Sequence, residues 1–140
     1  MSDHLFVYGT LRSECGHPMH RLLTRHAERV GMARYAGRLY DLGGYPGVVP
    51  EPAAVPSVRG ELYRLREPRA LWPSLDRYEG CTDPGDAGAE YRRERQAVLR
   101  EDGTPVQAWM YLYNRPTDGL RPIPGGDFLQ RTPSPPAPTA

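Results

Sequence analysis

The sequence predicts one mixed α/β (α+β) domain, with a small sheet that curls into a barrel and a few short helices beside it. Three observations lead to this fold class. The chain has 140 residues, a length that suits a single domain. Strand patterns outnumber helix patterns along it. The two helix patterns are separated by strands, which is typical of a mixed architecture.

The first elements are a short strand and an amphipathic helix. The run Leu5-Phe6-Val7-Tyr8 is apolar and ends at Gly9, as a buried strand followed by a turn does. A helix follows, and Pro18 suits its first turn. Its apolar positions have helical spacing and are Met19, Leu22, Leu23 and His26.

The middle of the chain predicts two strands, over residues 37–42 and 58–65. Turn signals at Gly43-Gly44 and Tyr45-Pro46-Gly47 follow the first strand, and a proline-rich loop precedes the second. A second helical pattern then follows Pro68, at Leu71, Leu75 and Tyr78. Because an internal proline removes a helix hydrogen bond, Pro73 predicts a short helix that begins near that residue.

Two strand candidates, residues 93–100 and 106–113, flank the hairpin turn signal Asp102-Gly103. Both faces of the second candidate are apolar, so we expect most of it in the core, with one tyrosine hydroxyl, that of Tyr111, available to a pocket. The chain then becomes rich in proline. We expect a folded domain over residues 1–128 and a flexible tail over residues 129–140.

Composition excludes several classes of function. The chain has 18 arginines, no lysine and 17 acidic residues, so its net charge is +1. This small charge argues against a nucleic-acid-binding domain. The absence of lysine excludes Schiff-base chemistry. No apolar stretch approaches a membrane span, and the start lacks the pattern of a signal peptide. Two cysteines are too few for a disulfide scaffold, so we expect a reduced, cytoplasmic protein. We expect no cofactor and no metal, since no histidine pairs with a cysteine at zinc-site spacing.

Glu79 is the most informative residue for chemistry. It lies four residues after Leu75 and therefore stands at the edge of the apolar helix face. Partial burial would raise the pKa of its carboxyl group and make it a useful general base. The alternative is a boundary glutamate that pairs with an arginine or reaches solvent.

The segment Tyr8-Gly9-Thr10-Leu11-Arg12 is a second candidate. A glycine directly after a buried strand lets backbone N–H groups approach a ligand, and several such groups can bind a carboxylate or an oxyanion. A plain turn at the strand end is the alternative. Cys15 and Cys81 lie near these candidates, but no pattern links them to a histidine base, so we expect free thiols rather than a catalytic one.

These segments together resemble the gamma-glutamylcyclotransferase-like proteins, which include the AIG2-like and YtfP-like branches, gamma-glutamylamine cyclotransferase and the BtrG type. The resemblance begins with Phe6-Val7-Tyr8-Gly9-Thr10-Leu11-Arg12 and covers residues 5–128. Further segments fit in the same order, namely residues 37–41 with 45–46, 58–63, 75–80, 91–93, 108–111 and 126–128.

The resemblance implies a mixed α/β fold with a small barrel and a cavity at one end. It implies that Glu79 is the acid/base residue and that Tyr8, Gly9, Thr10 and Leu11 form the substrate-binding loop, to which we add Tyr111. The implied reaction converts a gamma-glutamyl amine or peptide into 5-oxoproline and a free amine.

Two departures from the family pattern are Pro73 and the long acidic loop at residues 83–90, which could reshape the pocket rim. A hydrolase or amidotransferase in the same pocket, and a ligand-binding module without turnover, remain open as alternatives. The oligomeric state and the departing amine stay undetermined.

Overall fold

The computed structural model describes residues 3–8, 18–42, 46–78 and 91–123. Its strands are β1 (His4–Val7), β2 (Ala27–Tyr35), β3 (Gly37–Asp41), β4 (Pro46–Pro50), β5 (Val58–Leu65), β6 (Tyr91–Arg100), β7 (Pro105–Tyr113) and β8 (Arg121–Pro122). Its helices are α1 (Pro18–His26) and α2 (Pro68–Tyr78). This mixture of strands and two short helices confirms the predicted fold class.

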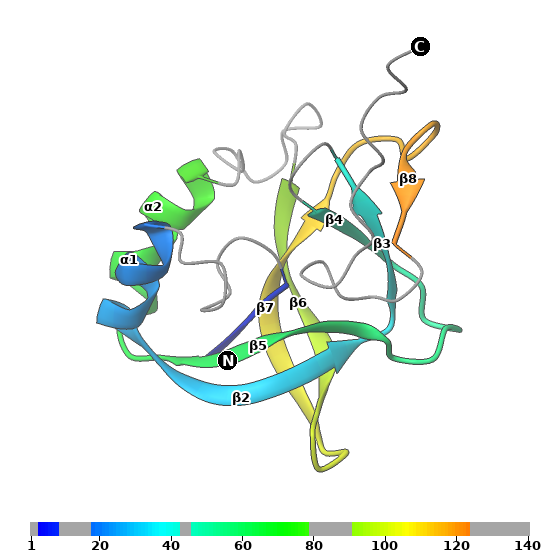
Figure 1. Cartoon of the computed structure of the whole chain (residues 1–140). Coiled ribbons are helices and arrows are strands. Elements are labelled where there is room, and N and C mark those ends of the chain that lie inside the picture. Colours follow the sequence, from blue (N-terminus) through cyan, green and yellow to red (C-terminus); the bar gives the residue numbers. More distant parts are fainter. Residues whose placement is uncertain (1–2, 9–17, 43–45, 79–90, 124–140) are drawn as a thin grey trace, which may run out of the picture.

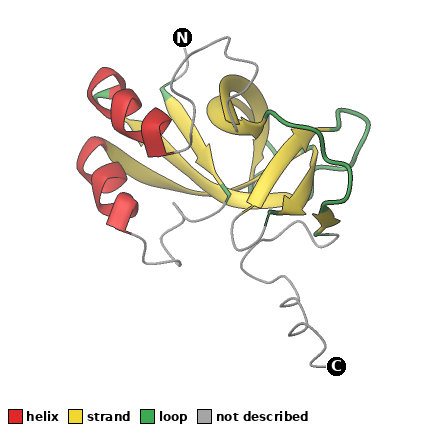
Figure 2. Cartoon of the chain, turned by 90° about the horizontal axis from the view of Figure 1, so that it is seen from above, coloured by secondary structure: helices red, strands yellow, loops and turns green. Residues whose placement is uncertain are grey.

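Five strands close into a barrel in the order β1-β5-β2-β6-β7, and the parallel pairing of β7 with β1 at Trp109 and Leu5 completes it. The other three strands form a separate small sheet in the order β4-β3-β8. Both helices lie side by side on one flank of the barrel, away from this small sheet (Figures 1 and 2). The predicted curling of the sheet is therefore correct.

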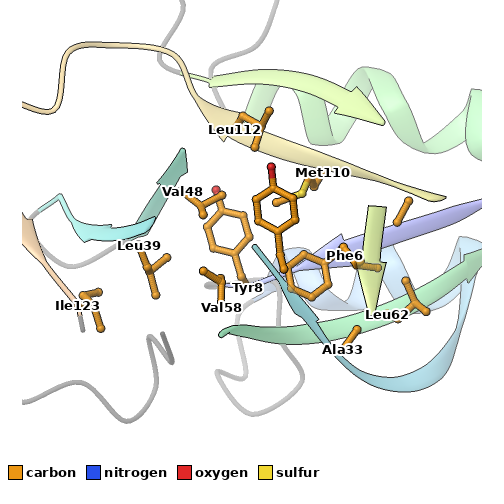
Figure 3. Packing of buried hydrophobic residues seen from close by; sticks show 13 residues of the cluster. Phe6, Tyr8, Ala33, Leu39, Val48, Val58, Leu62, Met110, Leu112 and Ile123 are labelled. Carbon is orange, nitrogen blue, oxygen red and sulfur yellow. The ribbon is translucent and has the colours of Figure 1, made fainter. Parts of the chain in front are cut away.

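Alternation along the strands divides the buried residues into two clusters. Successive side chains of a strand point to opposite faces. In β7 the side chains of Ala108, Met110 and Leu112 therefore enter the barrel, whereas those of Tyr111 and Tyr113 face outward. The interior cluster is drawn in Figure 3 and also contains Phe6 and Tyr8.

The outer cluster packs the two helices onto the barrel. Leu23 of α1 and Leu71 and Leu75 of α2 are fully buried there. They meet strand residues that include Leu5, Val7, Tyr63 and Tyr111. Each fully buried leucine contributes about 1.5–3 kcal/mol relative to an exposed one, so this apolar contact holds α2 in place.

The helix around Pro73 corrects one prediction. The sequence pattern favoured a short helix beginning near Pro73, but α2 begins at Pro68 and contains Pro73. Pro73 has no N–H group to donate to the backbone carbonyl four residues earlier in the helix. Because Pro73 is exposed, water can bond to that carbonyl instead. The buried Leu71 and Leu75 on the other side make continuation of the helix favourable despite that lost bond.

The region from Ala27 to Pro50 also differs from expectation. No sequence pattern predicts β2, because a β-bulge shifts its register between Arg29 and Gly31 and breaks the two-residue period of the strand. Residues 46–47 were predicted as part of a turn, but they begin β4, where Pro46 pairs with Asp41. A proline is tolerated as the first residue of a strand. The hairpin at Gly103 is confirmed, since Gly103 has a φ of 86° and its N–H bonds to the Arg100 carbonyl.

Candidate functional site

Of the predicted site residues, the structure describes Tyr8 and Tyr111. Tyr8 directly follows β1, and Tyr111 lies in β7; both are almost fully buried. The remaining candidates lie outside the described residues, namely Gly9, Thr10, Leu11, Arg12, Cys15, Glu79 and Cys81. The acidic loop at residues 83–90 and the tail at residues 129–140 also lie outside them. The structure therefore describes the strand directly before the candidate loop and the helix directly before Glu79.

A hydrogen bond joins the two described candidates. The hydroxyl of Tyr8 donates to the backbone carbonyl of Tyr111 at 2.5 Å. β1 and β7 are parallel neighbours in the barrel, which brings the end of one strand beside the other. The residue immediately before Gly9 is thus tied to β7.

Tyr111 also contacts α2. Its hydroxyl donates to Oδ1 of Asp76 at 2.7 Å, and Asp76 lies three residues before Glu79. One tyrosine therefore connects the strand that leads into the candidate loop with the helix that leads into the candidate acid/base. The sequence predicts a role for the Tyr111 hydroxyl but gives no signal for Asp76.

Arg93 of β6 completes this network. Its Nε donates to Oδ1 of Asp76 at 3.0 Å, and its Nη2 donates to Oδ2 at 3.3 Å. The guanidinium also lies over the ring of Trp72 at 4.2 Å and over that of Trp109 at 5.0 Å. No local pattern links Asp76 to Arg93, because 17 positions separate them and only the fold brings them together.

Two more tyrosines lie where β6 begins and β7 ends. The hydroxyl of Tyr91 donates to the backbone carbonyl of Pro46 at 2.5 Å. The ring of Tyr91 meets that of Tyr113 edge-on, with centroids 5.9 Å apart. This aromatic pair joins the start of β4 to the barrel and belongs to the same outer cluster as Tyr111.

Glu61 is a fully buried carboxylate in β5, on the same face as Val7, with which it is paired. Arg29 Nε donates to its Oε2 at 2.8 Å, and the Tyr63 hydroxyl donates to its Oε1 at 3.2 Å. Burial and the neighbouring Glu61 charge raise the pKa of the Tyr63 hydroxyl, which therefore stays protonated. Glu61 lies in the family-like segment 58–63, but no sequence pattern predicts a role for it.

Gly60 allows β1 to pass close to β5. A Cβ atom at this position would lie 2.4 Å from the Val7 carbonyl oxygen and 2.7 Å from the Phe6 ring. Any other residue would push β1 away, and with it the Tyr8 hydroxyl that reaches Tyr111. Gly60 is thus a structural requirement for the geometry at the end of β1.

Within the described ranges, no group of three or more histidine, cysteine, aspartate or glutamate side chains is arranged to hold a metal ion. Among those same residues, no helix is long and apolar enough to cross a membrane. Among the described residues, the Tyr111 hydroxyl contacts the carboxylate of Asp76, which also binds the guanidinium of Arg93.

Comparison with known proteins places the chain in a family. The model of the family described as "Gamma-glutamyl cyclotransferase, AIG2-like" matches residues 5–130. The gamma-glutamylcyclotransferase family protein YtfP of Escherichia coli is 36% identical over 127 residues, which cover 91% of this chain and 96% of that protein. A putative gamma-glutamylcyclotransferase of Vibrio cholerae is 36% identical over 135 residues, covering 94% and 99% of the two chains.

Solved structures agree with these relatives. The solution structure of ytfP from Escherichia coli superposes with a TM-score of 0.57, at 36% identity and with 91% of this chain and 96% of that chain covered. An AIG2-like protein from Mus musculus gives a TM-score of 0.58 at 26% identity, covering 79% and 76% of the two chains.

The match defines the class as the gamma-glutamylcyclotransferase-like enzymes. This chain belongs to the gamma-glutamyl cyclotransferase, AIG2-like family, which confirms the resemblance drawn from its motifs.

Proposed function

We propose that the chain cyclises a small gamma-glutamyl amine or peptide and releases 5-oxoproline and a free amine. The observation that carries the proposal is the hydrogen-bonded link from Tyr8 through Tyr111 to Asp76. It connects the two chain segments that continue into the candidate loop and into Glu79. Family membership supports the same reaction class.

The reaction is an intramolecular acyl transfer. The α-amine of the substrate attacks its own γ-carbonyl carbon, and a carbon–nitrogen bond forms that closes a five-membered ring. Collapse of the tetrahedral intermediate breaks the original amide bond. The attacking nitrogen goes from ammonium to ring N–H and so loses two protons, and the departing nitrogen takes up two and leaves as an ammonium. The nucleophile is the substrate's own amine, so no protein nucleophile is required. The first proton has to be removed before the attack.

Glu79 moves that proton. An α-ammonium group has a pKa near 8, so it is mostly protonated at neutral pH and cannot attack. Glu79 accepts the proton as a general base and then delivers it to the departing amine as a general acid. Loss of such a group costs about 10² to 10⁴ in rate.

The loop after β1 holds the substrate. Backbone N–H groups of Gly9, Thr10 and Leu11 donate to the oxyanion that develops on the γ-carbonyl oxygen. Tyr8 and Tyr111 bound the site at the end of β1 and on β7. Folding the substrate so that its amine meets its carbonyl supplies much of the remaining rate.

The test is incubation of the purified protein with a panel of gamma-glutamyl amides, followed by product analysis. We expect 5-oxoproline and one equivalent of free amine, at a rate that the Glu79→Gln variant loses. Release of glutamate instead would identify a hydrolase. Binding without either product would identify a non-catalytic module, and both results would refute the proposal.

A further inference from the structure

We propose that Asp76 and Arg93 are positioning residues, whose ion pair fixes the last turn of α2 for catalysis. This inference rests on the proposed function, because that turn ends at Tyr78, one residue before Glu79. Neither residue touches the reacting atoms in this proposal. They act by holding the helix end at a defined place relative to β6 and β7.

The Asp76 carboxylate receives donors from two neighbouring strands. Arg93 donates two parallel hydrogen bonds to its two oxygens, and Tyr111 donates a third to Oδ1. Arg93 and Tyr111 are directly paired in the β6–β7 register. Bidentate arginine–carboxylate pairs fix orientation as well as distance, so this arrangement restrains the helix turn in more than one direction.

The guanidinium of Arg93 is itself held in place. It lies over the ring of Trp72, which precedes Asp76 by one helical turn, and over that of Trp109 on β7. The side chains of Arg93 and Asp76 are 20% and 19% exposed. An ion pair with this restricted access to water is screened less than a surface pair.

The last turn of α2 needs such a restraint. The final carbonyl groups of a helix have no partners within it. Pro73 removes one further hydrogen bond from this 11-residue helix. The buried Leu75 packs the turn against the barrel, but apolar contact alone is not directional. The ion pair between Asp76 and Arg93 adds a contact whose strength depends on the orientation of the helix turn.

Arg95 provides a matched control for Arg93. Both are arginines of β6, and both lie over the ring of Trp109, Arg95 at 5.5 Å. Arg95 is exposed, and it lies two residues along the strand from the arginine that binds Asp76. Glutamine at each position removes the same charge, but only the change at Arg93 breaks the pair.

The first measurement is steady-state kinetics of 5-oxoproline release. We expect kcat to fall about tenfold or more in Asp76→Asn and in Arg93→Gln, since a displacement of about 1 Å can cost about 10² in rate. KM should stay within about twofold, because substrate contacts remain. Arg95→Gln should match the wild type. The double variant Asp76→Asn/Arg93→Gln should lose no more than the worse single variant.

The second measurement is amide hydrogen exchange at residues 77–79, which needs no turnover. Exchange should become faster in Asp76→Asn and Arg93→Gln and stay unchanged in Arg95→Gln. If the wild-type protein makes no 5-oxoproline, the proposed function is wrong. The exchange rates then test by themselves whether the Asp76–Arg93 ion pair fixes the last turn of α2. Unchanged exchange in Asp76→Asn, a rise in KM at constant kcat, or equal losses in Arg95→Gln would overturn it.

Discussion

The hydroxyl of Tyr8 donates a hydrogen bond to the backbone carbonyl of Tyr111 across 103 positions of the sequence. Both residues are almost fully buried. The contact closes the end of β1 onto β7, whose Tyr111 hydroxyl continues to Asp76 on α2. The two segments that carry the candidate chemistry therefore start from one hydrogen-bonded unit.

Replacing Tyr8 by phenylalanine removes this hydrogen bond between two buried residues. We expect the free energy of unfolding to fall by about 0.5–1.5 kcal/mol, and the affinity for 5-oxoproline, the expected product, to fall as well. Calorimetry measures both quantities. Unchanged affinity in folded Tyr8→Phe protein would count against a role for Tyr8 in the site.

Tyr35→Phe is the matched control for this change. The Tyr35 hydroxyl is also buried, and it donates to Gln96 at 2.9 Å. Burial raises the pKa of that hydroxyl to about 12, so it remains a hydrogen-bond donor at neutral pH. The control should lose stability but keep its affinity for 5-oxoproline.

Glu79→Gln keeps the size of the side chain and removes its capacity to accept a proton. We expect an intact fold and a loss of about 10² to 10⁴ in kcat. Circular dichroism checks the fold, and a 5-oxoproline assay checks the rate. Near wild-type kcat on the best substrate would show that Glu79 is not the general base.

Gly9→Val places a branched side chain in the loop where backbone N–H groups are proposed to meet the substrate. We expect a folded protein that binds 5-oxoproline weakly, because the side chain blocks close approach. Gly103→Val, in the β6–β7 hairpin turn, is the comparison, since it strains a residue with a φ of 86°. It should reduce stability without reducing affinity. If Gly9→Val binds as well as the wild type, the loop assignment is wrong.

Gly60→Ala tests the close approach of β1 and β5. The new Cβ atom would collide with the Val7 carbonyl oxygen and the Phe6 ring, so we expect a loss of about 1–3 kcal/mol in stability, or more. Gly103→Ala has open space around the added Cβ atom and should cost about 1 kcal/mol through its positive φ alone. Chemical denaturation compares the two, and an equal or smaller loss at Gly60 would refute the steric argument.

Removal of residues 129–140 should leave the folded domain intact. The proline-rich composition of this segment cannot bury enough apolar surface to offset the entropy of ordering it. We expect the melting temperature of the truncated chain to stay within about 2–4 °C of that of the full chain, a shift that corresponds to a loss of about 1 kcal/mol or less. A larger fall would show that the tail contributes to the fold.

The fold class, most strands and the family follow from local patterns in the sequence. The apolar, β-branched and aromatic residues within 58–65 and 106–113 are a local property, and they predict two strands that the structure contains. Each of these strands contributes residues to both buried clusters. The motifs around Tyr8 and Glu79 were recognisable for the same reason, since each occupies a few consecutive residues. Where local periodicity was interrupted, at the bulge of β2 and at Pro73, prediction failed.

Which residues surround those motifs depends on contacts between elements that are distant in the sequence. The partners of Asp76 lie on β6 and β7, and those of Glu61 lie on β2 and on β5 itself. Barrel closure between β1 and β7 brings Tyr8 to Tyr111, and no local pattern encodes that closure. Such contacts form because buried polar groups need hydrogen-bond partners, and the identity of each partner depends on the whole packing arrangement.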